Sequence, residues 1–303
     1  MRPLRIGTRG SALALWQARA VAAALERLGR PNEIITINTR GDRKQDAPLT
    51  AIGGKGVFVK EIHDALFAET IDVAVHSAKD MAAVPPEGLT VAAALAREDP
   101  RDALILPRFQ SFNTDPAARE RVIGTGSPRR IAQLRRLYPH ARFEPIRGNV
   151  DSRLRKLDDG QVDMLVLACA GLRRLGLEDR ITRAIPVTEC VPAPGQGIIA
   201  IEVRRSDERT VALLSTMNDP AARTALTAEQ AVVEELGGGC QLPLGVFAEI
   251  EAGTLAIRAI AASVDGKAFL DASVEADPRD PREAGIRLGR QLAHRGAREL
   301  LQL

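Results

Sequence analysis

The sequence predicts an α/β protein with two domains built from strands and helices, followed by a small α+β domain. Short segments rich in β-branched residues alternate with amphipathic helical segments through the first two thirds of the chain. After Pro220 the pattern changes to a long helix, three strand-like segments and a last helix. The alternation favours largely parallel sheets in the first two domains, where ligand sites lie at the carboxyl ends of the strands.

Apolar spacing and the residues that begin or end each segment predict the individual elements. Ser11 is typical of a helix N-cap, and the helix that follows keeps an apolar face until Gly29 and Pro31. The polar, glycine-rich stretch 40–56 predicts a mobile loop, and the stretches 98–102 and 191–197 predict crossings between domains. Expected strands cover residues 4–8, 33–38, 72–76, 90–94, 103–106, 121–124, 141–146, 164–168, 244–249, 255–263 and 268–274, and expected helices cover 57–68, 129–137, 152–157, 221–236 and 282 to about 300.

The composition excludes several classes of protein. The chain has 303 residues, 45% of them hydrophobic and 27% charged, which suits two or three globular domains. A net charge of +3 and an aromatic content of 3% do not indicate a nucleic-acid or membrane-surface protein. Three cysteines do not indicate a disulfide framework, and no apolar membrane span or signal segment stands out, so we expect a cytoplasmic protein.

Arginine is strongly favoured over lysine, with 36 Arg and 6 Lys. Codon bias would explain the totals, whereas guanidinium groups that bind carboxylates or phosphates would explain a local concentration. Residues 119–156 contain ten Arg and one Lys against three acids, which is a local excess of eight positive charges. The distribution therefore favours an anion-binding region.

Four predicted strand-to-helix turns combine glycine or small residues with arginine. Helix N-termini favour anions because their N–H groups are unpaired and the helix dipole is positive there. Each turn taken singly also fits ordinary helix capping, but together they predict a cleft for several carboxylates or phosphates. The turns are residues 8–11, 124–130, 147–153 and 171–174.

Two further segments carry candidate chemistry. A predicted buried strand ends in the run 76–80. Asp80 in this run fits either a general acid or base, or the partner of Lys79 in a loop ion pair. His76 fits either a site residue or a core histidine. Cys240 follows three glycines, which is the setting of a nucleophile or attachment point, or of an incidental cysteine in a glycine-rich turn. No His or Cys spacing fits a zinc site, so no metal is expected.

Taken in order, the motifs of the chain resemble the porphobilinogen deaminase (hydroxymethylbilane synthase) family of tetrapyrrole biosynthesis. The resemblance runs from Arg5 to the final helix and departs from the family's usual residues at Ala51, Ala78 and Gly126. The matching motifs are Gly7-Thr8-Arg9, Thr39-Arg40-Gly41-Asp42, Gly53-Gly54-Lys55-Gly56, His76-Ser77-Ala78-Lys79-Asp80, the run 97–103, Arg147-Gly148-Asn149-Val150, Pro194-Gly195-Gln196-Gly197 and Gly238-Gly239-Cys240-Gln241.

The resemblance implies a fold and a reaction. It implies two domains like those of type II periplasmic binding proteins, residues 1–97 with 198–216 and residues 101–193, and a third α+β domain over 220–303. It also implies a transferase that condenses four porphobilinogen molecules head to tail with loss of ammonia and then releases hydroxymethylbilane by hydrolysis. The chain grows on a covalent dipyrromethane cofactor, one per chain, which a thioether bond would attach to Cys240.

The resemblance also assigns roles to individual residues. It makes Asp80 the catalytic carboxylate. It implies porphobilinogen as the small-molecule partner and a transient hand-over of product to the next enzyme of the pathway. Composition and charge indicate no nucleic-acid or membrane partner, and we expect a monomer because no exposed, self-complementary apolar stripe is evident in the sequence. The positions that would bind the cofactor and the growing chain are Arg9, Ser11, Lys55, His76, Ser77, Lys79, Thr125, Ser127, Arg129, Arg130, Arg147, Asn149, Arg153, Arg174 and Gln196.

Two other classes of function fit parts of the pattern. A non-catalytic carboxylate-binding protein on the same two-lobed scaffold would use the arginine-rich turns but would have no use for Cys240. A cysteine-dependent acyl-transfer enzyme would need a general base beside Cys240, and none of the four histidines has a motif that indicates this role.

Overall fold

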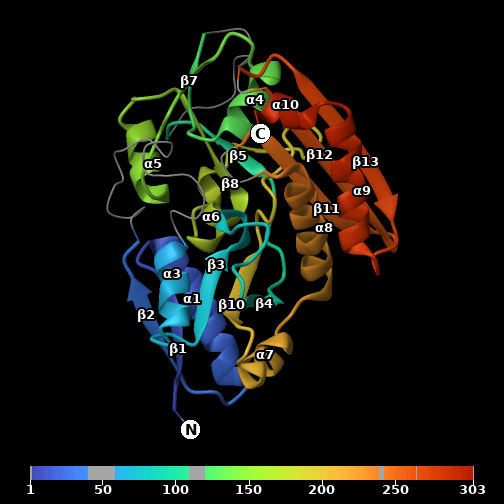
Figure 1. Cartoon of the computed structure of the whole chain (residues 1–303). Helices are drawn as coiled ribbons and strands as arrows, with labels where there is room; N and C mark the ends of the chain where they lie inside the picture. The colour runs from blue at the N-terminus through green and yellow to red at the C-terminus, as the bar shows by residue number, and fades with distance from the viewer. Residues whose placement is uncertain (1, 40–58, 109–119, 239–241, 264, 303) are drawn as a thin grey trace.

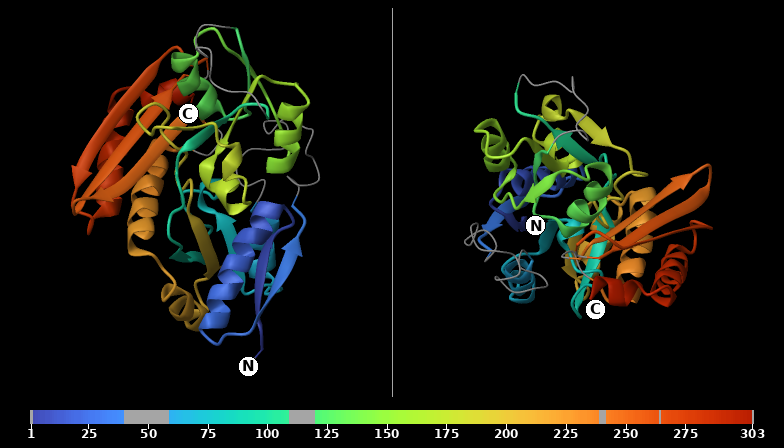
Figure 2. Two further views of the ribbon diagram at one scale, coloured as in Figure 1. Left: turned by 180° about the vertical axis from the view of Figure 1, so that it is seen from behind. Right: turned by 90° about the horizontal axis from the view of Figure 1, so that it is seen from above.

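The computed structural model describes residues 2–39, 59–108, 120–238, 242–263 and 265–302. In these residues the chain forms two five-stranded sheets and one three-stranded sheet, each covered by helices (Figure 1). The first sheet lies in the lower part of Figure 1 and the second above it, while the third packs along the side of both (Figure 2). The expected fold class is therefore confirmed. No helix in the described part of the chain is both long and apolar enough to cross a membrane.

The first sheet combines strands from both ends of the two-lobed region, in the order β2-β1-β3-β10-β4. Helices α1 (Ala12–Arg27) and α7 (Glu208–Ser215) bury apolar side chains against one face, and α3 (Lys60–Phe67) covers the other. The strands are β1 (Leu4–Arg9), β2 (Asn32–Ile37), β3 (Val73–Ser77), β4 (Leu89–Ala94) and β10 (Ile199–Arg204).

The second sheet repeats the arrangement of the first, in the order β7-β6-β8-β5-β9. Helix α4 (Pro128–Leu137) covers one face, and α5 (Val150–Asp158) and α6 (Cys169–Arg174) cover the other. A short 3₁₀ helix, η3 (Glu178–Arg180), precedes the last strand. The strands are β5 (Asp102–Ile105), β6 (Val122–Gly124), β7 (Arg142–Glu144), β8 (Met164–Ala168) and β9 (Arg183–Ile185).

The expectation of largely parallel sheets is confirmed with one exception in each sheet: four strands of each five-stranded sheet run in one direction, and the fifth is reversed. In the first sheet β10 pairs antiparallel with both β3 and β4, and in the second β5 pairs antiparallel with both β8 and β9. Both β5 and β10 follow directly after a stretch in which the chain passes from one sheet to the other. A strand that arrives from the other sheet enters from the opposite end, so its direction is reversed.

The crossing between the sheets depends on a close approach of two backbones. Gly197 has φ +88°, and a Cβ built on it would lie 2.2 Å from the carbonyl oxygen of Glu98 in the other crossing. An L-residue disfavours this φ, and the space excludes a side chain. The two crossings therefore run side by side and hold the two sheets together.

The third domain is an antiparallel sheet, β11-β12-β13, covered by helices. Helices α8 (Pro220–Leu236) and α9 (Pro281–His294) pack on each other and on this sheet around one apolar core. The single last helix that we expected is wrong, because Gly296, with φ +90°, separates α9 from the short α10 (Ala297–Leu301). The strands are β11 (Leu244–Glu251), β12 (Thr254–Ala262) and β13 (Phe269–Ala276).

Candidate active site

The predicted turns of the first lobe bring short polar side chains to the carboxyl ends of β1 and β3. Ser11 is the N-cap of α1 and its hydroxyl accepts a hydrogen bond from the Ala14 amide at 3.3 Å. Ser77 closes β3 and its hydroxyl receives a 2.8 Å hydrogen bond from the Gln17 side chain of α1. Directly after Ser77 the chain forms the 3₁₀ helix η2 (Ala78–Asp80), which carries Lys79 and Asp80 in partly buried positions.

Two helices of the second lobe begin at predicted turns and confirm their caps. The Ser127 hydroxyl accepts from the Arg130 amide at the start of α4, and the Asn149 side chain accepts from the Ser152 amide at the start of α5. Such caps hold the first turn of a helix by about 1 kcal/mol each. The fourth predicted turn is wrong: Gly171 lies inside α6, which spans Cys169–Arg174.

A fully buried carboxylate, Asp102 at the start of β5, organises the arginines at the start of α4. The Arg129 guanidinium donates to it at 2.7 and 3.2 Å, and the Arg130 guanidinium donates at 2.8 and 3.0 Å. The Gln196 side-chain amide adds a hydrogen bond at 3.0 Å from the crossing segment. Burial raises the pKa of Asp102, but the two guanidiniums outweigh this and hold it far below its usual range.

The contacts of Asp102 change the interpretation of both arginines. Arg129 also donates to the Val191 carbonyl at 2.7 Å, and Arg130 donates to the Val166 carbonyl at 2.9 Å. Both side chains are buried, so most of their donors are directed at the protein itself. Sequence reasoning missed Asp102, although its position beside a predicted domain crossing was a usable signal.

Positive charge from the second lobe converges on η2 of the first. Burial and the nearby charges of Arg130 and Arg129 lower the pKa of Lys79 to about 8, although Asp80 and Asp102 oppose this shift. Burial and the charges of Arg130 and Arg147 likewise lower the pKa of Arg153 to about 10, and Asp80 again opposes the shift. Asp80 therefore lies within electrostatic range of Lys79 and Arg153, which come from different lobes.

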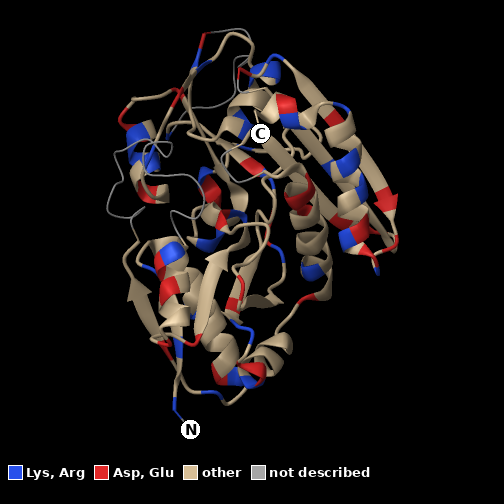
Figure 3. Ribbon diagram, in the orientation of Figure 1, with Lys and Arg blue, Asp and Glu red and all other residues tan. Residues whose placement is uncertain are grey.

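Seven charged residues, given at the end of this paragraph, lie close together where the two lobes meet, and we call them the lobe-interface cluster. It holds five cations and two carboxylates, so it carries a net charge of +3 when all are ionised. Figure 3 shows the Lys and Arg positions on the elements that contribute to it. The members are Lys79, Asp80, Asp102, Arg129, Arg130, Arg147 and Arg153.

Not every arginine of the basic stretch 119–156 belongs to the lobe-interface cluster. The Arg135 guanidinium donates to the carbonyl of Asp265 at 3.1 Å, and the Arg136 guanidinium lies 4.9 Å from the centre of the Phe269 ring. These two residues face the third domain. The positive charge of this stretch is thus not all gathered in the lobe-interface cluster, and part of it lies at a contact between domains.

The remaining predicted site residues of the described chain have varied surroundings. The Arg174 guanidinium donates to the Gly197 carbonyl at 2.6 Å and lies 5.7 Å from the centre of a ring of Trp16, so it joins the lobes. Arg9 and Arg147 are partly buried and both interact within the chain. Thr125 is buried at the carboxyl end of β6, and its hydroxyl accepts a hydrogen bond from the Ser127 amide at 3.3 Å.

His76 lies apart from the lobe-interface cluster. Its Nε2 is 3.3 Å from a carboxylate oxygen of Glu202 on β10, and the Nε2 of His63 on α3 is 2.9 Å from the same oxygen. Burial raises the pKa of Glu202, but contact with the two imidazoles lowers it to about 2. Neither His63 nor Glu202 was expected to take part in a site.

Two predicted residues, Lys55 and Cys240, lie outside the described residues, as does the predicted loop 40–56. The other two cysteines are buried, and burial raises the pKa of Cys169 and of Cys190 to about 12. Both thiols therefore stay protonated near neutral pH, which makes them poor nucleophiles.

Glu229 of α8, which sequence reasoning also missed, anchors the third domain to the crossing. Its carboxylate accepts from Arg97 at 2.7 Å and from the Gly195 amide at 2.6 Å, and from the Ala248 amide of β11 at 2.8 Å. The fully buried carboxylate thus contacts both crossings and the sheet of the third domain. This connection holds the third domain against both crossings between the lobes.

Fold and site together define a class of protein: a two-lobed α/β protein with a group of cations and one partly buried carboxylate between the lobes. Comparison with known proteins defines it further. Residues 4–212 match the family model described as porphobilinogen deaminase, dipyromethane cofactor binding domain, and residues 223–294 match that of the porphobilinogen deaminase C-terminal domain.

Curated relatives cover nearly the whole chain. Porphobilinogen deaminase of Acidithiobacillus ferrooxidans is 46% identical over 99% of this chain and 97% of its own length. That of Syntrophomonas wolfei is 46% identical over 99% of this chain and 98% of its own. Among solved structures, the second substrate binding domain of a putative amino acid ABC transporter from Streptococcus pneumoniae aligns over 78% of this chain and 95% of that one at 11% identity, with a TM-score of 0.46, too weak to support an argument.

The chain belongs to the porphobilinogen deaminase family. Family membership confirms the resemblance drawn from the motifs and the expectation of an enzyme of the transferase class that takes part in tetrapyrrole biosynthesis.

Proposed function

We propose that this chain condenses four porphobilinogen molecules head to tail with loss of ammonia and then releases hydroxymethylbilane by hydrolysis. The observation that carries the proposal is the net charge of +3 in the lobe-interface cluster. Each porphobilinogen has one acetate and one propionate group, so a growing oligopyrrole accumulates the anions that such a cluster lacks. Paired guanidinium–carboxylate contacts would also orient each ring.

The same cluster fits a dipyrromethane held by its carboxylates. The pKa values of Lys79 and Arg153 are lowered because burial and neighbouring cations destabilise their charged forms. Ligand carboxylates bound beside them would stabilise those charged forms. When attached, the dipyrromethane supplies the pyrrole carbon at which the chain is extended. We propose Cys240 as its thioether anchor, supported by the match of residues 223–294 to the family and by the buried, protonated state of the other two thiols.

Asp80 is the proposed catalytic carboxylate. The backbone of η2 is fixed by a 3.0 Å hydrogen bond from the Ala78 amide to the Ile198 carbonyl, while no described residue donates a hydrogen bond to the Asp80 carboxylate itself. Its oxygens are therefore free to act on a substrate. Departure of ammonia leaves a cation on the substrate, which an ionised carboxylate stabilises, and the same carboxylate accepts the α-proton released after coupling.

The arginines fall into two groups in this proposal. Arg153 and Arg147 bind ligand carboxylates, together with Lys79 and Arg9. Arg129 acts as a positioning residue, because its donors hold Asp102 and the Val191 carbonyl. We further propose a cytoplasmic monomer that hands its product to the next enzyme of the pathway.

Asp80→Asn tests the assignment because the amide keeps the shape of the side chain and removes its charge. We expect turnover of porphobilinogen to fall at least about 100-fold, the lower end for loss of a general acid or base, with an unchanged melting temperature. Asp151→Asn, which removes an exposed carboxylate from the first turn of α5, is the matched control and should keep near-normal turnover. Near-normal turnover in Asp80→Asn would show that Asp80 is not the catalytic carboxylate.

A further inference from the structure

Glu202 stands apart from the other fully buried carboxylates of the described chain. A buried carboxylate needs a compensating charge because removing it from water is costly. This arginine-rich chain supplies a guanidinium to three of four such carboxylates: Asp72 is paired with Arg5, Asp102 with Arg129 and Arg130, and Glu229 with Arg97. Glu202 has only the imidazoles of His63 and His76.

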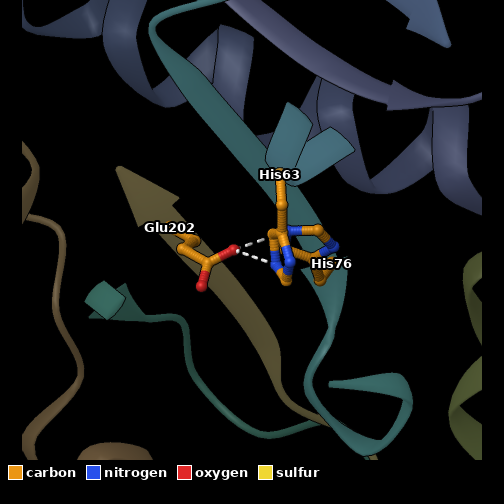
Figure 4. A group of neighbouring side chains, drawn as sticks. All are labelled: His63, His76 and Glu202. Atoms are coloured by element: carbon orange, nitrogen blue, oxygen red, sulfur yellow. Dashed lines mark ion pairs between the residues drawn. The ribbon is translucent and has the colours of Figure 1, made fainter. Parts of the chain in front are cut away.

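The contacts between these three side chains do not have the geometry of hydrogen bonds. Both Nε2 atoms approach one oxygen of Glu202, at 2.9 and 3.3 Å, and the rings meet edge to face with centroids 6.0 Å apart (Figure 4). Yet neither nitrogen and neither oxygen has an acceptable hydrogen-bond partner in the described part of the chain. The N–H bond of a protonated Nε2 and the lone pair of an unprotonated Nε2 point in the same direction, in the plane of the ring. Because neither imidazole makes an acceptable hydrogen bond with Glu202, this direction leads to a point beside the carboxylate oxygen rather than to the oxygen itself.

We propose that His63, His76 and Glu202 bind one divalent transition-metal ion, with zinc the best match. Two neutral imidazoles and one carboxylate are a common donor set for zinc that keeps a fourth position for water. Ligands about 2.0–2.2 Å from a tetrahedral ion lie about 3.3–3.6 Å apart, and the donor atoms here all lie within 4.8 Å of one another. The ion would supply the positive charge that the other buried carboxylates obtain from arginine.

The proposed ion would join three elements of the first lobe. His63 lies on α3, His76 on β3 and Glu202 on β10, so the ion would fix α3 to the sheet. His63 is the most exposed of the three, at 13%, and marks the side from which an ion enters. The group is distinct from the lobe-interface cluster, although His76 precedes Asp80 by only four residues. The proposed role is therefore to stabilise the strand that positions Asp80, not to act on substrate.

Metal titration of the purified full-length protein tests this proposal. After removal of metal with a chelator, the chain should bind one equivalent of Zn²⁺ by calorimetry and melt a few degrees higher with excess zinc. Co²⁺ should give the visible bands of a tetrahedral site with nitrogen and oxygen ligands. His63→Gln should weaken Zn²⁺ binding by more than the ~10–100-fold that loss of an outer-shell partner costs.

Two further variants keep the test interpretable. His294→Gln removes an exposed histidine on α9 and should leave the affinity unchanged. Glu202→Gln removes the buried negative charge and should abolish the Co²⁺ bands, so it tests the site even if His63→Gln folds poorly. Absence of bound Zn²⁺, an affinity unchanged by His63→Gln, or a Co²⁺ spectrum with thiolate charge-transfer bands would each overturn the proposal.

Discussion

Replacing Asp102 by asparagine should destabilise the second lobe strongly. The carboxylate accepts four guanidinium hydrogen bonds, two each from Arg129 and Arg130, and a fifth hydrogen bond from Gln196. Asparagine has the same shape but only one accepting oxygen, and its amide would direct N–H bonds at the guanidiniums. Two arginine charges would then be buried without a counter-charge.

The size of the effect follows from this loss. Removing one partner of a buried ion pair costs about 3–5 kcal/mol, whereas exposed pairs contribute little. At about 2 °C per kcal/mol for a chain of this size, the melting temperature of the second lobe should fall by about 6–10 °C. Asp277→Asn is the matched control, because Asp277 pairs with Arg279 at an exposed position and its loss should leave the melting temperature unchanged.

Differential scanning calorimetry at several pH values measures the effect. The pKa of Asp102 in the folded chain lies far below its ordinary value of 3.8, so its stabilising effect is complete above about pH 4 and declines as the pH falls further. The difference between the parent and the variant should therefore be constant near neutral pH and shrink in acid. A fall of less than about 2 °C at neutral pH, well under the range derived above, would refute the account of Asp102.

Two other predictions concern the same region. Burial and the nearby arginines lower the pKa of Lys79 to about 8, so its ammonium loses its proton above that pH. We therefore expect kcat/KM for porphobilinogen to fall above about pH 8 in the parent but to persist to higher pH in Lys79→Arg. Identical pH profiles would contradict a role for the positive charge of Lys79 in binding substrate. Gly197→Ala should lower the free energy of unfolding by about 1–3 kcal/mol more than Gly253→Ala does. Both glycines have φ above +80°, but only the new Cβ at residue 197 would clash with a backbone oxygen, that of Glu98, at 2.2 Å. Equal melting temperatures for the two alanine variants would show that the close approach between the crossings is unimportant.

Local interactions made part of the site predictable from the sequence. Ser11, Ser127 and Asn149 each cap a helix by accepting a hydrogen bond from the backbone amide three residues later, so a short segment contains both partners. The alternation of strands and helices is equally local, and it placed most elements to within a few residues. The helical spacing continued past Gly296, however, and gave no warning that the last helix is divided.

Interactions between distant segments could not be predicted in the same way. The sequence suggested that Arg129 binds a ligand carboxylate. Its actual partner, Asp102, is 27 residues away in sequence, and nothing in the sequence shows that the two side chains point toward each other. Strand β10 pairs with β3 and β4, which lie far from it in the sequence. Its antiparallel direction follows from the crossing through which the chain returns to the first sheet, so no local pattern could predict it. His63 and Glu202 come from separate elements, so no His or Cys spacing in the sequence could indicate the proposed metal site.

Intact mass is the measurement that tests the central claim most directly. The purified protein should exceed its sequence mass by two deaminated porphobilinogen units, and the excess should be absent from Cys240→Ser but present in Cys169→Ala, which alters a buried thiol. That pattern would establish the cofactor and its anchor together. A parent mass equal to that of the bare sequence, unchanged after incubation with porphobilinogen, would contradict the account and favour a non-catalytic carboxylate-binding protein.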